Sequence, residues 1–92
     1  MKRITVEYAS FLLRKLTARE RELLELEDRA TLKGLIELLG EKYGGELAVK
    51  FLSRSADALM ATVTIDGLGV TDPSVLLKDG SVIKLFPLMG GG

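Results

Sequence analysis

The sequence of 92 residues contains no cysteine, no histidine and no tryptophan. Without cysteine, the chain can form no disulfide and no thiolate metal site. Without histidine, it lacks the commonest general acid–base group and the commonest metal ligand. Nucleophile systems that pair serine or cysteine with histidine are therefore excluded within this chain. We expect no bound cofactor and no metal site, and we expect catalysis to be supplied by other proteins.

An excess of charge of one sign and a long apolar run are also lacking. Lysine plus arginine number 13, as do aspartate plus glutamate, so the formal net charge is zero. A neutral chain lacks the basic footprint of a nucleic-acid-binding protein. No apolar run approaches the roughly 20 residues that span a bilayer, and the first residues lead into a strand pattern rather than a signal peptide. We expect a cytoplasmic protein with no nucleic-acid or membrane partner.

One loose basic stretch interrupts this balance. It consists of Arg14, Lys15, Arg19 and Arg21, broken by Glu20. Charge runs of this kind are usually solvated. We interpret the stretch as a solvated loop.

Alternating apolar residues predict two strands near the N-terminus. Ile4, Val6 and Tyr8 alternate with polar residues, which is typical of a half-buried strand, and Leu24 and Leu26 share one face of a second strand. Residues 9–16 are mixed, and we expect a loop or turn there, with or without a helical turn. The two strands should form a β-hairpin.

The clearest helical pattern follows. Apolar residues recur at positions i, i+3, i+4 and i+7, namely Leu32, Leu35, Ile36 and Leu39. Thr31 is a good N-cap because its hydroxyl can accept from a free amide of the first turn. Gly44-Gly45 ends the helix after Tyr43, since a positive φ is easily adopted by glycine.

The second half predicts shorter elements. We expect a short helix and then a loop within residues 46–59, and a β-branched strand over residues 62–65. Asp66-Gly67 predicts a tight turn into a returning segment at residues 68–70. Leu76 and Leu77 are expected on a short helical turn. A last strand covers residues 82–86 and stops at Pro87, which cannot donate to a sheet.

This order predicts an α+β fold, with a mixed four- to five-stranded sheet over one main helix. Residues 1–87 form one domain, and residues 88–92 form a flexible tail that ends in Gly90-Gly91-Gly92. Glycine has no Cβ, so such a tail could thread a channel that side chains would block. Its one reactive group is the α-carboxylate of Gly92. The alternative is that the glycines are only a frayed end.

The C-terminal sequence Leu77-Lys78-Asp79-Gly80-Ser81-Val82-Ile83-Lys84-Leu85-Phe86-Pro87 and its glycine end resemble a known family pattern. That pattern is L-x-D-G-D-x-V, a hydrophobic strand, F-P-P and a terminal Gly-Gly. It belongs to the ubiquitin-like sulfur carriers, with the molybdopterin synthase small subunit as the most similar branch. The segments Tyr8–Leu12, Ala30–Leu35 and Val63–Gly67 resemble further family segments in the right order.

The resemblance implies the β-grasp fold and a carrier that is not itself an enzyme. It implies that an adenylating enzyme of the ubiquitin-activating type uses Mg-ATP to activate Gly92, and that a persulfide donor converts it to a thiocarboxylate. It implies delivery of the sulfur to a pterin precursor in the large molybdopterin synthase subunit. Ser81, Val82 and Leu88 depart from the usual Asp, Glu and Pro. The alternative of a protein modifier, joined through Gly92 to lysines of target proteins, therefore stays open.

The partner surface is expected beside this tail. Phe86, Pro87, Leu88 and Met89 flank the glycines. Aromatic and methionine side chains are common in interface cores. We expect Phe86 either to anchor a partner or to cap the core of the domain.

Overall fold

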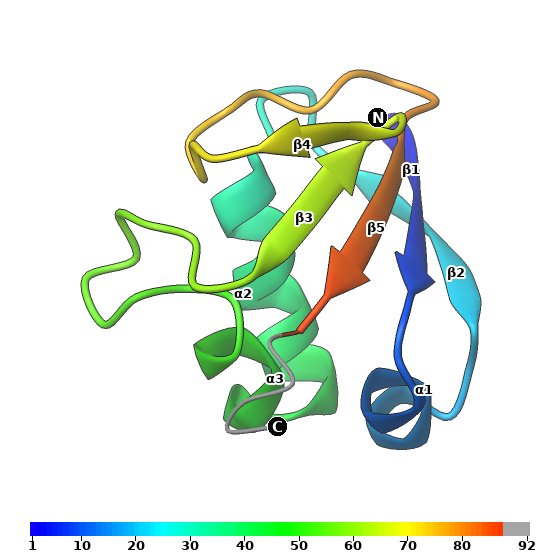
Figure 1. Cartoon of the computed structure of the whole chain (residues 1–92). Coiled ribbons are helices and arrows are strands. Elements are labelled where there is room, and N and C mark those ends of the chain that lie inside the picture. The colour runs from blue at the N-terminus through cyan, green and yellow to red at the C-terminus, as the bar shows by residue number, and fades with distance from the viewer. Residues whose placement is uncertain (88–92) are drawn as a thin grey trace.

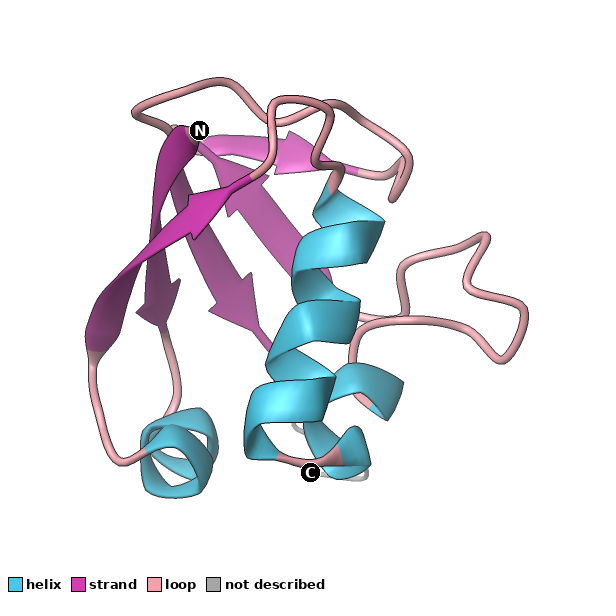
Figure 2. Cartoon of the chain, turned by 180° about the vertical axis from the view of Figure 1, so that it is seen from behind, coloured by secondary structure: helices cyan, strands magenta, loops and turns pink. Residues whose placement is uncertain are grey.

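A five-stranded mixed sheet and one long helix form the centre of the fold. The computed structural model describes residues 1–87. Its elements in chain order are β1 (Lys2–Tyr8), α1 (Phe11–Thr17), β2 (Arg21–Leu26), α2 (Leu32–Tyr43), α3 (Gly45–Val49), β3 (Thr62–Ile65), β4 (Leu68–Val70) and β5 (Val82–Phe86). The strand order is β2-β1-β5-β3-β4, and α2 lies across one face of the sheet (Figures 1 and 2). The predicted mixed sheet over one main helix is confirmed.

The first and last strands are parallel neighbours in the middle of the sheet. Thr5 lies opposite Val82, and Tyr8 lies opposite Leu85. All other neighbouring strands are antiparallel. A parallel pair cannot be closed by a tight turn and needs a long crossover connection. The remaining elements form that connection, so the end of β5 is placed beside the end of β1.

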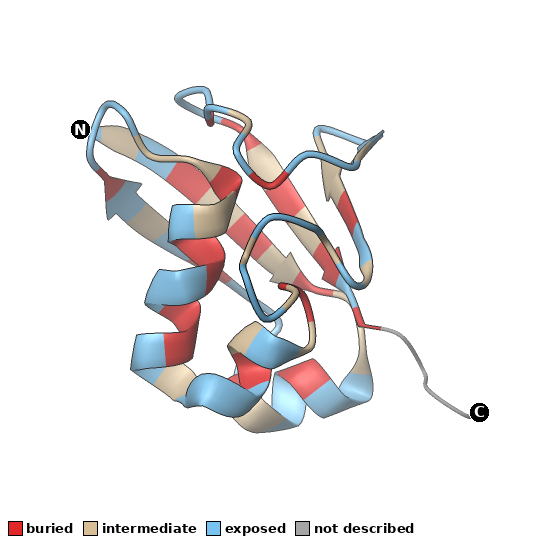
Figure 3. Ribbon diagram, turned by 90° about the vertical axis from the view of Figure 1, so that its left-hand side faces the viewer, coloured by how far each residue is buried: buried red, intermediate tan, exposed pale blue. Residues whose placement is uncertain are grey.

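The core lies between the sheet and α2. Alternate residues of β1 and β5 point toward the helix, and one stripe of α2 points back at them. These side chains are buried: Ile4, Val6, Tyr8, Leu32, Leu35, Ile36, Leu39, Ile83 and Leu85 (Figure 3). Burial of each large apolar side chain contributes about 1.5–3 kcal/mol, so this contact is a major source of the stability of the domain.

The ends of α2 follow the prediction. The hydroxyl of Thr31 accepts a hydrogen bond of 3.1 Å from the amide of Gly34. At the other end, Gly44 has a φ of 111° and donates its amide to the carbonyl of Gly40 at 2.8 Å. The tight turn at Asp66-Gly67 is also confirmed, because both residues have positive φ.

Two segments differ from the expectation. Residues 11–17 form a helix of two turns rather than a loop. The predicted helical turn at Leu76 and Leu77 is wrong, because these residues are extended and Leu76 bridges to Thr31. The physical reason is that free amides at the start of α2 need acceptors. Leu32 donates to the carbonyl of Val75, and Lys33 donates to that of Pro73.

The contact between α2 and α3 generates a stability prediction. A Cβ added at Gly40 would lie 2.8 Å from the Cβ of Ala48, whereas one added at Gly34 would meet nothing closer than 3.4 Å. Gly40→Ala should cost a net ~1 kcal/mol, because overpacking of roughly 1–3 kcal/mol exceeds the gain in helix propensity. Gly34→Ala should stabilise by about 0.5–1 kcal/mol. Urea unfolding measures both changes, and equal stabilisation by the two variants would contradict the tight contact.

Candidate functional site

The end of β5 carries the described part of the predicted site. Ile83 and Leu85 face the core, while Val82, Lys84 and Phe86 face the opposite side of the sheet. Phe86 is 37% exposed, and the Nζ of Lys84 lies 5.9 Å from the centre of its ring. Phe86 therefore lies on the sheet face that α2 does not cover. Its role as a partner anchor stays a prediction.

The next residues divide between described and undescribed positions. Pro87, the last described residue, is buried. Its ring is thus packed against this domain. The sequence also predicts roles for Leu88, Met89 and Gly90–Gly92, and these lie outside the described residues.

A groove of about 410 Å³ lies beside the end of β5, and we call it the β5-end groove. Its lining is largely polar and charged. The lining residues are Glu7, Tyr8, Ala9, Arg14, Glu20, Arg21, Lys84 and Phe86. They come from β1, α1, the start of β2 and β5, so the parallel pairing of β1 with β5 is what brings them together.

Charges alternate across the strands at this groove. Glu7 on β1 lies opposite Arg21 on β2 and opposite Lys84 on β5. The Nζ of Lys84 is 3.6 Å from a carboxylate oxygen of Glu7. Opposite charges on neighbouring strands stabilise a sheet modestly. Sequence reasoning noted the basic stretch but missed the groove, because only the strand register shows which charges meet.

A buried carboxylate lies close to this groove. The side chain of Glu22 on β2 is 3% exposed. One carboxylate oxygen accepts from the hydroxyls of Tyr8 at 2.5 Å and Tyr43 at 2.6 Å, and the other accepts from Lys42 at 2.7 Å and Arg19 at 3.2 Å. Four donors thus surround one acceptor group, and the charge is paired twice.

These contacts set the protonation states. Burial by itself raises the pKa of Glu22, but the hydrogen bonds from Lys42, Tyr43 and Tyr8 together hold that pKa below its usual value. Burial, followed by the hydrogen bond to Glu22, raises the pKa of Tyr8 well above its usual value. Glu22 is therefore ionised and fully hydrogen-bonded at neutral pH, which suits a structural tie rather than a general base.

The tie joins the end of β1, the start of β2 and the last turn of α2. Tyr8 is followed by Ala9, whose amide donates to the carbonyl of Leu85 at 3.0 Å. The Glu22 cluster thereby holds the end of β1 against the end of β5. Glu22 lies on the same strand face as Leu24 and Leu26. The sequence pattern of this strand gives no sign that donors from three segments meet at Glu22.

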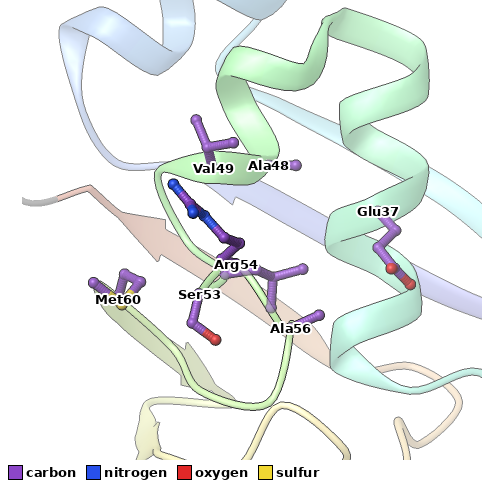
Figure 4. Close-up of a pocket in the computed structure, with 8 residues that line it drawn as sticks. Glu37, Ala48, Val49, Ser53, Arg54, Ala56 and Met60 are labelled. Atoms are coloured by element: carbon purple, nitrogen blue, oxygen red, sulfur yellow. The ribbon is translucent and has the colours of Figure 1, made fainter.

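A second cavity, of about 540 Å³, lies beside α3 and the segment that follows it (Figure 4). It is mainly apolar, with Val49, Leu52 and Met60 in its lining, and it also contains Glu37 and Arg54. None of the site residues predicted from the sequence lines it. Within residues 1–87, no group of three potential metal ligands is present. Among these residues, no helix is long and apolar enough to cross a membrane.

Comparison with known proteins decides the family. The model described as the ThiS family matches residues 12–92. The chain belongs to the ThiS family. The match extends through the glycine end and confirms the resemblance to ubiquitin-like sulfur carriers. No curated protein matches the chain in sequence.

Three solved structures share the fold of this ThiS-family chain. The putative molybdopterin converting factor subunit 1 of Pyrococcus furiosus is 24% identical, over 95% of this chain and 98% of that one, with a TM-score of 0.72. The small archaeal modifier protein 1 of Methanosarcina acetivorans is 22% identical, over 100% of this chain and 98% of that one, with a TM-score of 0.71. A chain in the complex of molybdopterin-converting factor subunits 1 and 2 from Helicobacter pylori 26695 is 21% identical, over 98% of this chain and 99% of that one, with a TM-score of 0.63. The predicted β-grasp fold is confirmed.

The Glu22 cluster generates a prediction about stability and pH. Glu22→Gln should cost about 2–4 kcal/mol at neutral pH, because an amide offers one acceptor oxygen to four donors and removes the buried countercharge. Glu25→Gln on the same strand is the control, since Glu25 is exposed and its Arg3 partner is 4.0 Å away. That control should change stability by less than about 0.5 kcal/mol.

The pH dependence follows from the lowered pKa of Glu22. A carboxyl with a depressed pKa contributes stability above its unfolded pKa, near 4.3, and loses it as pH falls through the folded value. The gap between wild type and Glu22→Gln in urea unfolding should therefore shrink below about pH 5. A gap that stays constant down to pH 3 would contradict an ionised Glu22.

Proposed function

We propose that this chain is a sulfur carrier for molybdopterin biosynthesis. The observation that carries the proposal is the frame from Asp79-Gly80 to Phe86-Pro87, which coincides with β5 and its approach and precedes Gly91-Gly92. The ThiS-family match through Gly92 supports it. So does the likeness to a putative molybdopterin converting factor subunit.

The proposed cycle begins at the carboxylate of Gly92. This carboxylate attacks the α-phosphorus of ATP in an adenylating partner, and pyrophosphate leaves as the acyl-adenylate forms. A persulfide sulfur then attacks the carbonyl carbon, and AMP leaves. A thiol reduces the resulting S–S bond and releases the thiocarboxylate. The large synthase subunit takes up the tail, and the thiocarboxylate sulfur attacks an electrophilic carbon of a pterin precursor and displaces an oxygen leaving group. Water then hydrolyses the resulting thioester, so that the sulfur stays on the pterin and Gly92 returns to a carboxylate.

The chain's own residues contribute position rather than catalysis. It has no histidine or cysteine, and the one buried carboxylate among the described residues has all its acceptor sites occupied. Its domain presents a short, thin segment to an active site on another protein. A thiocarboxylate suits the cargo role because its sulfur is a better nucleophile than a carboxylate oxygen near neutral pH.

Thiocarboxylate formation tests the proposal. The protein is incubated with an adenylating enzyme, Mg-ATP and sulfide, and its C-terminal peptide is examined by mass spectrometry. We expect the mass increase that replaces one oxygen with one sulfur, and its loss when Gly91-Gly92 is deleted. Omission of ATP is the matched control. An unchanged C-terminal peptide in the complete reaction would count against the carrier role.

A second function is favoured by a separate observation, the likeness to a small archaeal modifier protein. Here a lysine amine attacks the same acyl-adenylate and AMP leaves, which forms an isopeptide bond. Higher-mass conjugates in cell extract, lost on deletion of Gly91-Gly92, would identify this use. The two uses share activation of Gly92 and differ only in the nucleophile.

The partly exposed Phe86 generates a prediction about the partner. Phe86→Ala should weaken binding to the purified large molybdopterin synthase subunit by about tenfold or more, because aromatic anchors dominate interface energies. The stability of the domain should fall by less than about 1.5 kcal/mol, since the ring is 37% exposed. Titration calorimetry and urea unfolding measure the two effects.

Leu68→Ala is the matched control for this variant, because Leu68 is 73% exposed at the far edge of the sheet. It should leave binding unchanged. A stability loss of about 3–5 kcal/mol for Phe86→Ala, as for a core phenylalanine, would instead place Phe86 in the core.

A further inference from the structure

α1 presents an ordered but exposed apolar and basic face. Phe11 is 80% exposed, the highest exposed fraction among the large hydrophobic side chains of residues 1–87. The helix is nevertheless fixed in place. Ser10 accepts from the amide of Leu13, Leu13 is fully buried, and Thr17 donates to the carbonyl of Leu13. The exposure of Phe11 thus belongs to a fixed surface and does not result from fraying.

The same face carries two cations. Arg14 and Lys15 follow Phe11 by three and four residues, so the three side chains are neighbours on the helix surface. Arg14 donates its Nε to the carbonyl of Tyr8 at 3.0 Å and lines the β5-end groove. The exposed face of α1 therefore continues into the groove and reaches the place where Phe86 ends β5.

The charges of this region do not cancel locally. Glu7 is paired with Lys84, and Glu22 is paired with Lys42 and Arg19. Among residues 1–87, no ion pair involves the exposed side chains of Arg14, Lys15 and Arg21. The acids near them are the exposed Glu20 and the half-buried Glu7, which lies opposite Arg21 but is paired with Lys84. A chain with zero net charge thus gathers positive charge at the β5-end groove and on the adjoining face of α1, where Phe11 is exposed.

We propose that Phe11, Arg14, Lys15 and Arg21 form a docking platform for the enzyme that activates Gly92. The complementary surface on that enzyme is acidic and contains an apolar pocket for the Phe11 ring. This inference rests on the proposed function. The activating enzyme is the occupant because sulfur transfer and conjugation both require it, and because the platform borders the end of β5. Charged residues at the rim of an interface chiefly increase the rate of association, whereas a central aromatic residue contributes most of the binding energy.

ATP–pyrophosphate exchange by the purified adenylating enzyme, with this chain as substrate, tests the platform. Phe11→Ala and Arg21→Glu should each raise the KM for the chain about tenfold, with kcat unchanged, because the chemistry at Gly92 is untouched. Added salt should raise the wild-type KM, and it should do so less for Arg21→Glu, because salt screens the charges at the rim. Urea unfolding of each variant shows that the fold is retained.

Two controls match these changes away from the platform. Val49 is 70% exposed and Arg54 is exposed, and both border the cavity beside α3. Val49→Ala and Arg54→Glu should leave KM within about twofold, since surface changes outside a contact have little effect. Arg54→Glu alters the net charge by the same amount as Arg21→Glu, so an equal rise in KM for both would overturn the platform.

The outcomes separate this inference from the proposed function. Normal exchange with wild type and an unchanged KM for Phe11→Ala and Arg21→Glu would overturn the platform and leave activation of Gly92 standing. No exchange with wild type would overturn the proposed function, and this inference with it. A raised KM in both platform variants, with normal controls, supports the platform.

Discussion

The parallel pairing of β1 with β5 is the contact on which the rest of the structure depends. It joins residues more than seventy positions apart, from Thr5 with Val82 to Tyr8 with Leu85. Because parallel strands need a crossover, α2 is carried across the sheet, where its apolar stripe and the inner residues of both strands form one core. The same pairing brings the ends of β1 and β5 together. The β5-end groove, the exposed ring of Phe86 and the surface of α1 all lie there as a consequence.

The Glu22 cluster ties together β1, β2 and α2 at this end of the sheet. A buried carboxylate is unfavourable unless it is fully paired, and here four donors from three segments hold it. Only one arrangement of β1, β2 and α2 provides all of these hydrogen bonds, and any other arrangement would leave the Glu22 carboxylate buried without partners. The cluster thereby holds the end of β1 against the end of β5.

The sequence predicts well the features that depend on local residue patterns, and it predicts poorly those that depend on tertiary contacts. The stripe and caps of α2, the alternation of β1 and β5 and the Asp66-Gly67 turn are local patterns, and the structure confirms them. α1 was missed because a helix of two turns, with one fully buried residue, Leu13, has little periodicity. Leu76 and Leu77 were misassigned because their segment is shaped by the free amides of a distant helix end. The groove and the Glu22 cluster depend on strand register, which composition does not contain. The predicted roles of residues 88–92 lie outside the described part of the chain.

The central claim is that Gly92 carries a group that other proteins attach and remove. The most direct measurement is a single turnover in which the thiocarboxylated chain is mixed with the large molybdopterin synthase subunit and the pterin precursor. The C-terminal peptide and the pterin are then followed together by mass spectrometry. The account predicts that the peptide returns to the carboxylate form as sulfur appears in the pterin, mole for mole, and only when both partners are present. A thiocarboxylate that persists while the pterin gains no sulfur would contradict it.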